Sequence, residues 1–162
     1  MYENMKQVKK TVLKILFICH GNICRSPMAE FIMKSKTDEY YIESAATSAE
    51  EVGSSIYPQA REQLVKHNIK GFKDKRARQV KKPDYDEFDY LIIMDEENRY
   101  GLKRIVGEDI DNKIYKILDF AEDEKLKGKD VDDPWYTRDF DLCFNEIEKG
   151  CEGLLLHLQE KM

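Results

Sequence analysis

The sequence has few of the features that mark a secreted or membrane-bound protein. It contains only four cysteines in 162 residues, too few for a disulfide scaffold of this length. No apolar run approaches the roughly 20 residues needed to cross a bilayer. Residues 1–10 are polar and lack the apolar core and cleavage site of a signal peptide. These absences predict a cytoplasmic protein that begins with a short polar tail.

An excess of positive charge is also missing. The net charge is −5, which argues against non-specific binding to nucleic acid or to a membrane surface. A basic cluster at 70–82 is followed at once by acidic residues, as in a solvated loop and helix face. With 41% hydrophobic and 36% charged residues, the chain has enough apolar material for one core beneath a solvated surface. We therefore expect a single domain, 11–162, without repeats or linkers, that is monomeric.

Apolar runs alternate with helical patterns along the chain. Runs typical of strands occupy 12–18, 40–44, 88–94 and 113–118. Helical patterns begin near Pro27, cover 58–67 and 96–106, and resume from about Asp139 with an apolar stripe. Between the last two patterns, 121–135 is polar and irregular. This alternation predicts an α/β fold with a parallel sheet and right-handed crossovers.

The loop after the first predicted strand has the composition of an anion-binding site. It reads Cys19-His20-Gly21-Asn22-Ile23-Cys24-Arg25-Ser26-Pro27 and ends where a helix begins. Free N–H groups and the positive end of the helix dipole converge there. Gly21 and Asn22 tolerate left-handed backbone angles, which lets successive amides turn inward. Arg25 adds a fork of donors suited to phosphate oxygens. We predict a phosphate site in this loop.

Cys19 is predicted to lie at the base of the loop. The field that binds phosphate also stabilises a thiolate, and Ser26 could donate its hydroxyl to that sulfur. A thiolate beneath a bound phosphoryl group is a nucleophile directed at phosphorus. A buried structural cysteine would leave the Gly-Asn turn unexplained. The spacing of Cys19 and Cys24, with His20, matches a zinc site only weakly.

The loop closely resembles the signature of the low-molecular-weight protein tyrosine phosphatases. Similar stretches occur at 44–48, 94–98 and 132–136, so the resemblance runs from about residue 11 onwards. It implies a three-layer sandwich with a four-stranded parallel sheet in the order 2-1-3-4 and helices on both faces. It also implies hydrolysis of phosphotyrosine through a phosphocysteine on Cys19, without a metal or organic cofactor. The phosphate-binding residues would be His20, Gly21, Asn22, Ile23, Cys24, Arg25 and Ser26.

A general acid is needed because phenolate leaves poorly unless its oxygen is protonated. Composition alone leaves Asp132 and Asp133 as alternatives. The resemblance selects Asp133, directly before the proline, first as acid and then as base for the water that releases inorganic phosphate. It also suggests that Asp95 and Asn98 brace the loop from behind; Asp95 could equally serve only to begin a helix.

The predicted substrate pocket combines Ile23, Glu50, Trp135 and Tyr136. The two aromatic residues would form a wall for a phenyl ring, or else cover the core. Glu50 stands where the family usually has an aromatic residue, which predicts a negative rim and a preference for basic flanking residues. Related protein-arginine phosphatases generally carry threonine at the position of Ile23, so we favour a phosphotyrosine protein or peptide as substrate, with phosphoarginine as the alternative.

Two other functions remain open at this point: a phosphate-binding module without turnover, and a redox sensor based on a Cys19–Cys24 disulfide. Cys24 could protect an oxidised Cys19 or merely pack beneath the loop. Arsenate reduction would need a further nearby cysteine pair, whereas Cys143 and Cys151 are predicted to be buried in the last helix.

Lys75 stands where many relatives have a histidine that helps hold the loop. This difference suggests that the hydrogen-bond network around the loop is built differently in this protein.

Overall fold

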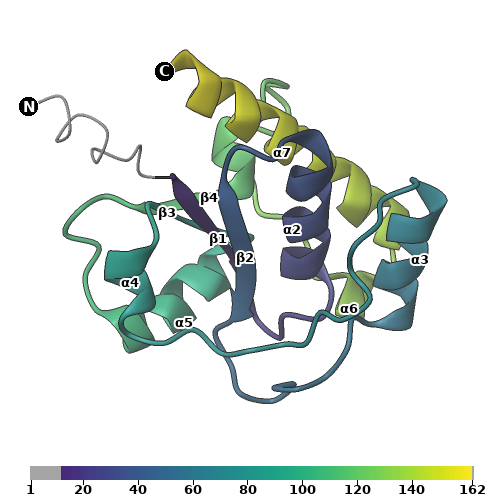
Figure 1. Ribbon diagram of the computed structural model, residues 1–162, viewed down its shortest axis with the longest axis horizontal. Coiled ribbons are helices and arrows are strands. Elements are labelled where there is room, and N and C mark those ends of the chain that lie inside the picture. The colour runs from purple at the N-terminus through teal and green to yellow at the C-terminus, as the bar shows by residue number, and fades with distance from the viewer. Residues whose placement is uncertain (1–11, 162) are drawn as a thin grey trace, which may run out of the picture.

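Four parallel strands form the central sheet of the computed structural model, which describes residues 12–161 (Figure 1). The predicted polar tail, 1–10, lies outside these residues. The strand order is β2-β1-β3-β4, and every pairing is parallel. The strands are β1 (Lys14–Cys19), β2 (Tyr41–Ala46), β3 (Tyr90–Ile93) and β4 (Ile114–Lys116). The predicted fold class and strand order are confirmed.

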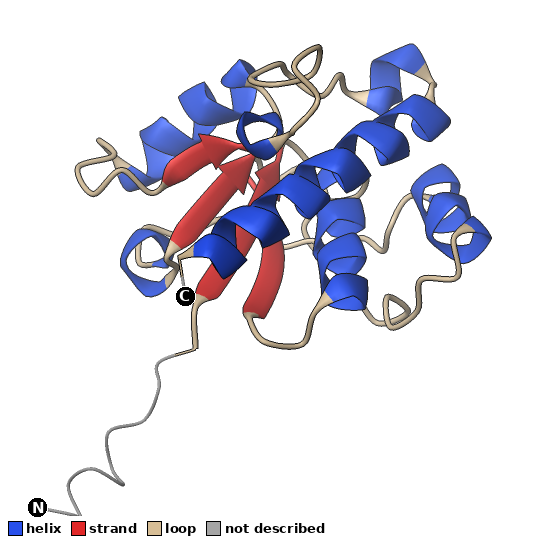
Figure 2. Ribbon diagram, turned by 90° about the horizontal axis from the view of Figure 1, so that it is seen from above, coloured by secondary structure: helices blue, strands red, loops and turns tan. Residues whose placement is uncertain are grey.

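Helices cover both faces of the sheet, as Figure 2 shows. One face carries α2 (Arg25–Lys36), α3 (Pro58–Lys66), α7 (Phe140–Glu160) and the 3-10 helix η1 (Ile117–Phe120). The other carries α4 (Asp84–Glu87) and α5 (Glu96–Val106), while α6 (Pro134–Thr137) lies in the loop before α7. Within 12–161, no helix is both long and apolar enough to cross a membrane.

Strand β1 is buried on both faces, which explains its nearly continuous apolar sequence. Ile15 and Phe17 belong to the core on the α2 and α7 side, whereas Leu16 and Ile18 belong to the core on the α5 side. All four are fully buried. Successive side chains of a strand point to opposite faces, so both faces demand apolar residues. Because β1 is a central strand, its C-terminal residue, Cys19, lies in the middle of the carboxyl edge of the sheet.

The structure differs from the sequence prediction in three short segments. The predicted strand 113–118 ends at Lys116, because Asp119 accepts a hydrogen bond from the Lys116 N–H and the chain turns into η1. Residues 84–87 form one helical turn that was not predicted. The irregular segment 121–135 runs into a second turn, α6, which begins at Pro134.

Helix α7 approaches η1 very closely at two glycines. A Cβ at Gly150 would lie 3.0 Å from the Ile117 carbonyl oxygen, and a Cβ at Gly153 would overlap the Phe120 carbonyl. The absence of side chains therefore lets the helix backbone rest directly on the segment that follows β4. The predicted apolar stripe of α7 is buried, which fixes the helix against α2 as well.

Candidate active site

The loop between β1 and α2 turns its carbonyl groups outward. The oxygens of Cys19, His20 and Ile23 accept hydrogen bonds from neighbouring segments, through the N–H groups of Thr47, Ser48 and Tyr57. Asn22 has a φ of 59°, the left-handed geometry that the sequence anticipated, and is only 1% exposed. Because these carbonyl groups point outward, the loop can present N–H groups to its interior, and this arrangement favours the binding of an anion.

The Cys19 sulfur receives several hydrogen-bond donors. It lies 3.3 Å from the N–H nitrogen of Asn22 and 3.4 Å from that of Ser26. The Ser26 hydroxyl lies 3.1 Å from the sulfur, where the sequence predicted it. The sulfur therefore lies at the floor of the loop, within hydrogen-bond distance of two backbone N–H groups and one hydroxyl.

Arg25 is a buried cation held from behind the loop. It is 2% exposed, and its Nη1 donates to the Asp95 carboxylate and to the Val131 carbonyl, both at 2.7 Å. Burial lowers the pKa of Arg25, but the charges of Cys19, Asp95 and Asp133 outweigh it and raise the pKa above its ordinary value. The guanidinium group therefore remains charged and oriented.

Asp95 has both of the roles that the sequence left open. Besides pairing with Arg25, its carboxylate accepts the Asn98 N–H at 2.7 Å and begins α5. The Asn98 side chain in turn accepts the backbone N–H groups of Met94 and Asp95. The end of β3 and the start of α5 are thereby locked behind the loop.

The structure brings Asp133, rather than Asp132, to the loop. Asp133 Oδ2 lies 3.5 Å from Arg25 Nη2, and its other oxygen accepts the Trp135 N–H at 3.0 Å. Asp132 is exposed and borders neighbouring hollows, not the pocket of Cys19. The residue before Pro134 is thus the carboxylate positioned opposite the sulfur-bearing loop.

A pocket of about 160 Å³ opens above Cys19. Its lining residues are Cys19, His20, Gly21, Ile23, Cys24, Arg25, Glu50, Glu51, Asp133, Trp135 and Tyr136. Trp135 and Tyr136 are 48% and 80% exposed, so they form a surface wall and do not cover the core. Trp135 packs edge-on against Tyr57, with ring centroids 5.2 Å apart.

Two acidic residues also line the pocket. Glu50 lies 3.3 Å from the His20 ring, and Glu51 lines the pocket beside it. Glu51 was missed by the sequence prediction, although its place directly after Glu50 was the available signal. The pocket is therefore lined by both aromatic and acidic residues.

The remaining cysteines are poor nucleophiles. All four cysteines are free and buried. Burial raises the pKa of Cys24, and the nearby charges of Cys19 and Asp133 raise it further. Burial likewise raises the pKa of Cys143 and Cys151, which lie in α7 as predicted. Among residues 12–161, no group of three or more His, Cys, Asp or Glu side chains is arranged to hold a metal ion.

Behind the loop, Lys75 takes part in a buried network. Its ammonium group donates to the Ser44 carbonyl at 3.0 Å and pairs with Glu30 at 3.1 Å. The Asn22 side chain donates to the Ser44 hydroxyl and accepts the Arg78 N–H. Glu30 and Arg78 were not identified from sequence, because their partners are distant in the chain.

A parallel sheet that ends in a cysteine–arginine anion loop, with an aspartate facing it, defines a cysteine-dependent phosphatase scaffold. The family described as low molecular weight phosphotyrosine protein phosphatase matches residues 14–162. The chain belongs to this enzyme family, as the resemblance of its motifs indicated.

Relatives of the chain span its length. It is 37% identical over 156 residues to the low molecular weight protein-tyrosine-phosphatase YfkJ of Bacillus subtilis, covering 93% of this chain and 98% of that protein. The crystal structure of YfkJ superposes with a TM-score of 0.87 at 36% identity, covering 94% and 98% of the two chains. The crystal structure of the Streptococcus pyogenes enzyme SP-PTP gives a TM-score of 0.81 at 39% identity, covering 91% and 93%.

Proposed function

We propose that this protein hydrolyses phosphotyrosine in proteins or peptides through a phosphocysteine on Cys19. The observation that carries the proposal is the position of the Cys19 sulfur. Two backbone N–H groups and the Ser26 hydroxyl contact it at the floor of a pocket that also contains Arg25 and Asp133. The family match and the names of the relatives support the same reaction.

The first step transfers the phosphoryl group to sulfur. The Cys19 thiolate forms the S–P bond as the bond between phosphorus and the tyrosyl oxygen breaks, and Asp133 gives its proton to that oxygen. Arg25 and the loop N–H groups stabilise the charge on the three equatorial oxygens. In the second step Asp133, now ionised, takes a proton from water, which attacks phosphorus and releases inorganic phosphate and the thiolate.

The pocket favours an aryl phosphate. Ile23 and Trp135 supply apolar surface for a phenyl ring, and Tyr136 extends the wall outward. Glu50 and Glu51 place negative charge in the lining of the pocket, which favours substrates with basic residues beside the phosphotyrosine. The proposal also treats 11–162 as one catalytic domain, acting as a monomer in the cytoplasm without a metal or organic cofactor, nucleic acid or membrane partner.

Hydrolysis of an aryl phosphate by wild type and by Cys19→Ser tests the assignment. The wild type is expected to turn over and Cys19→Ser to be inactive. A profile over phosphotyrosine, phosphoarginine and phosphoserine peptides then tests the substrate class. An inactive wild type would contradict the enzyme assignment, and better turnover of phosphoarginine would contradict the choice of substrate.

A further inference from the structure

Trp135 is an exposed aromatic residue of the pocket wall, and its own helix does little to hold its ring. It lies in α6, a single turn of four residues, and is 48% exposed. One helical turn is too short to be stable by itself, so contacts outside α6 have to fix the ring. The Asp133 carboxylate accepts the Trp135 N–H at 3.0 Å, which orients the backbone and not the indole ring.

Arg138 follows α6 in a backbone conformation that favours other residues. Its φ is 62° and its ψ is 12°, in the left-handed region that glycine and asparagine adopt most readily. Its N–H donates to the Pro134 carbonyl at 2.9 Å and ends the helical turn. A glycine could make the same backbone hydrogen bond at a lower conformational cost. An arginine in this conformation beside a site therefore indicates that the side chain itself has a role.

The Arg138 guanidinium group lies among three aromatic rings. Its central carbon is 5.5 Å from the ring centroid of Tyr57, 5.9 Å from that of Trp135 and 5.4 Å from that of Phe140. Its Nη2 donates to the Tyr57 hydroxyl oxygen at 3.0 Å, and its Nη1 donates to the Trp135 carbonyl at 3.4 Å. A cation within about 6 Å of a ring centroid is attracted to the face of the ring. One side chain thus contacts both the ring and the backbone of Trp135.

The other two rings are held by fixed parts of the fold. Phe140 begins α7 and is 6% exposed. Tyr57 stacks on Phe140, with ring centroids 5.9 Å apart and an angle of 16° between the ring planes. The Tyr57 N–H also donates to the Ile23 carbonyl of the anion-binding loop at 2.9 Å. Through Arg138 and Tyr57, the Trp135 ring is therefore connected to α7 and to the anion-binding loop.

We infer that Arg138 is a positioning residue that holds the Trp135 ring as the wall of the pocket, so that the pocket selects aryl phosphates over ligands without a ring. Arg138 does not line the pocket and acts through Trp135. The inference rests on the proposed function, in which the ring of phosphotyrosine packs beside Trp135. Inorganic phosphate has no ring, so its binding should not depend on this contact.

Trp135 is the only tryptophan of the chain, so tryptophan fluorescence reports on this ring alone. The test compares wild type with Arg138→Ala, which removes the guanidinium group, and with Arg138→Lys, which keeps a cation but loses the planar fork of donors. Fluorescence anisotropy measures the mobility of the ring, and acrylamide quenching measures its exposure. NMR titrations give dissociation constants for benzylphosphonate, an aryl ligand that cannot be hydrolysed, and for inorganic phosphate.

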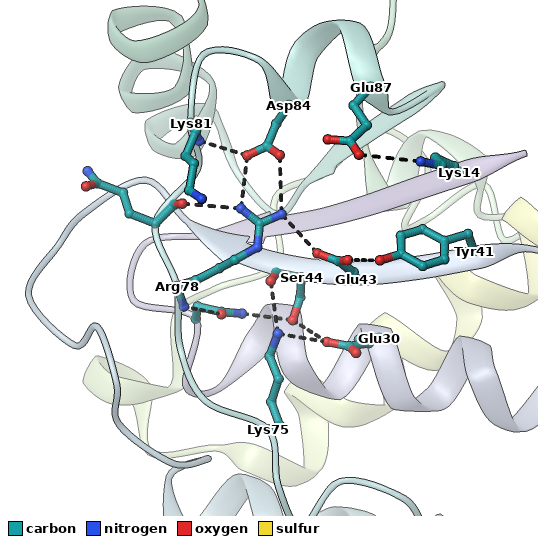
Figure 3. Close-up of polar contacts among 12 residues, drawn as sticks. Lys14, Glu30, Tyr41, Glu43, Ser44, Lys75, Arg78, Lys81, Asp84 and Glu87 are labelled. Atoms are coloured by element: carbon teal, nitrogen blue, oxygen red, sulfur yellow. Dashed lines mark hydrogen bonds and ion pairs between the residues drawn. The ribbon is translucent and has the colours of Figure 1, made fainter.

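Lys14→Ala is the matched control. The Lys14 ammonium group also lies over an aromatic ring, 5.1 Å from the centroid of Tyr41, and it pairs with Glu87 (Figure 3). Lys14 is the first residue of β1, at the opposite end of the strand from Cys19, and it does not line the pocket. The substitution removes one positive charge and one cation–ring contact far from Trp135, so it should behave as wild type in every measurement.

We expect Arg138→Ala to lower the anisotropy of Trp135 and to raise its acrylamide quenching constant. Binding of benzylphosphonate should weaken about three- to five-fold, the factor that a cation–ring contact at an exposed site supplies. The dissociation constant for inorganic phosphate should change by less than about two-fold, because an exposed charge outside the pocket contributes little. Arg138→Lys should give intermediate values, because it keeps the cation among the rings.

Wild-type anisotropy and wild-type affinity for benzylphosphonate in Arg138→Ala would overturn the inference. So would equal weakening of both ligands, because Arg138 would then act through its charge on any anion and not through Trp135. A more mobile ring with unchanged affinity for benzylphosphonate would also contradict it, since selection would not need a fixed wall. Failure of the proposed function is separable: these measurements need no turnover, so an inactive wild type would contradict only the phosphatase assignment.

Discussion

At the scale of single residues, two adjacent aspartates differ in their position relative to the pocket. Asp133 faces Arg25 across the pocket, whereas Asp132 is exposed outside it. In Asp133→Asn, the amide oxygen can still accept the Trp135 N–H, but the amide cannot protonate the leaving oxygen as a carboxylic acid does. We expect it to lower kcat by about 100-fold or more on phosphotyrosine, and by less on an aryl phosphate with a good leaving group. Steady-state kinetics on both substrates measure this difference.

Asp132→Ala is the matched control for that substitution. It changes a neighbouring carboxylate of the same loop and should leave kcat within about two-fold of wild type, because Asp132 does not line the pocket. If Asp132→Ala were the more damaging change, the assignment of the general acid would be wrong.

The acidic rim predicts selectivity among peptides. The Glu50 side chain is exposed, and one of its oxygens lies 3.3 Å from the His20 ring, so a basic residue beside phosphotyrosine can approach the carboxylate from solvent. We expect kcat/KM to be a few-fold higher for a peptide with arginine flanks than for one with glutamate flanks, as an exposed charge pair allows. Glu50→Gln should reduce this ratio, and raised salt should reduce it further. If wild type and Glu50→Gln gave equal ratios of kcat/KM for the two peptides, Glu50 would not contribute to peptide selectivity.

The sequence was most informative where one short segment contains both the residue and its partner. Cys19, Arg25 and Ser26 lie within one loop, so their meeting follows from strand–loop–helix geometry. The Glu30–Lys75 pair joins α2 to a loop 45 positions away and could not be foreseen without the packing of β2 between them. The choice between Asp132 and Asp133 likewise needed the family resemblance and then the structure, in which Asp133 lines the same pocket as Cys19.

At the scale of elements, the contact between α7 and η1 depends on glycine. Alanine favours helix over glycine by roughly 1 kcal/mol, so propensity alone predicts that Gly153→Ala stabilises α7. The added Cβ would overlap the Phe120 carbonyl, so we expect the opposite sign. Overpacking of this kind typically costs about 1–3 kcal/mol in the free energy of unfolding, measured by urea denaturation.

Glu152→Ala provides the comparison within the same helix. Position 152 is exposed, and its loss of an ion pair with Lys36 should change stability by less than about 1 kcal/mol. A Gly153→Ala protein as stable as wild type would show that α7 does not rest on the Phe120 backbone as described.

Element types were predictable where periodicity was strong, as in α7 and β1. Element types were less predictable where a single hydrogen bond determines the local backbone geometry. The strand expected at 113–118 stops at Lys116 because the Asp119 carboxylate caps its N–H, a contact that hydrophobic patterning does not register. The turn at Pro134 is similarly begun by the Asp133 carboxylate.

At the scale of the whole molecule, stability should fall with acidification in two stages. Burial and then Lys161 hold the pKa of His157 below its ordinary value of 6.5, with Glu160 opposing. The unfolded chain therefore takes up this proton first, and stability is lost as pH falls below about 6.5. Burial raises the pKa of Glu43, but hydrogen bonds from Tyr41 and Arg78 outweigh it and hold the pKa below 4.5. The stability due to Glu43 is thus present above about pH 4.5 and lost below it.

Urea unfolding near pH 7.5, 5.5 and 3.5 checks both stages. Glu43→Gln should reduce the second stage without removing it, because the pKa values of Glu96 and Asp141 are also lowered. His157→Gln should reduce the first stage and leave the second unchanged. Stability that rises from pH 7.5 to 5.5 would contradict the sign assigned to His157.

In the proposed mechanism, the phosphoryl group is carried on the Cys19 sulfur between the two steps. Asp133→Asn slows the attack of water on the intermediate, so this variant, mixed with an aryl phosphate that has a good leaving group and quenched in acid during turnover, should retain it. Mass spectrometry is expected to find one phosphoryl group on the Cys19 peptide, and none when Cys19 is replaced by serine in the same background. Continued turnover with no phosphoryl group on Cys19, or a phosphoryl group on another residue, would contradict the account.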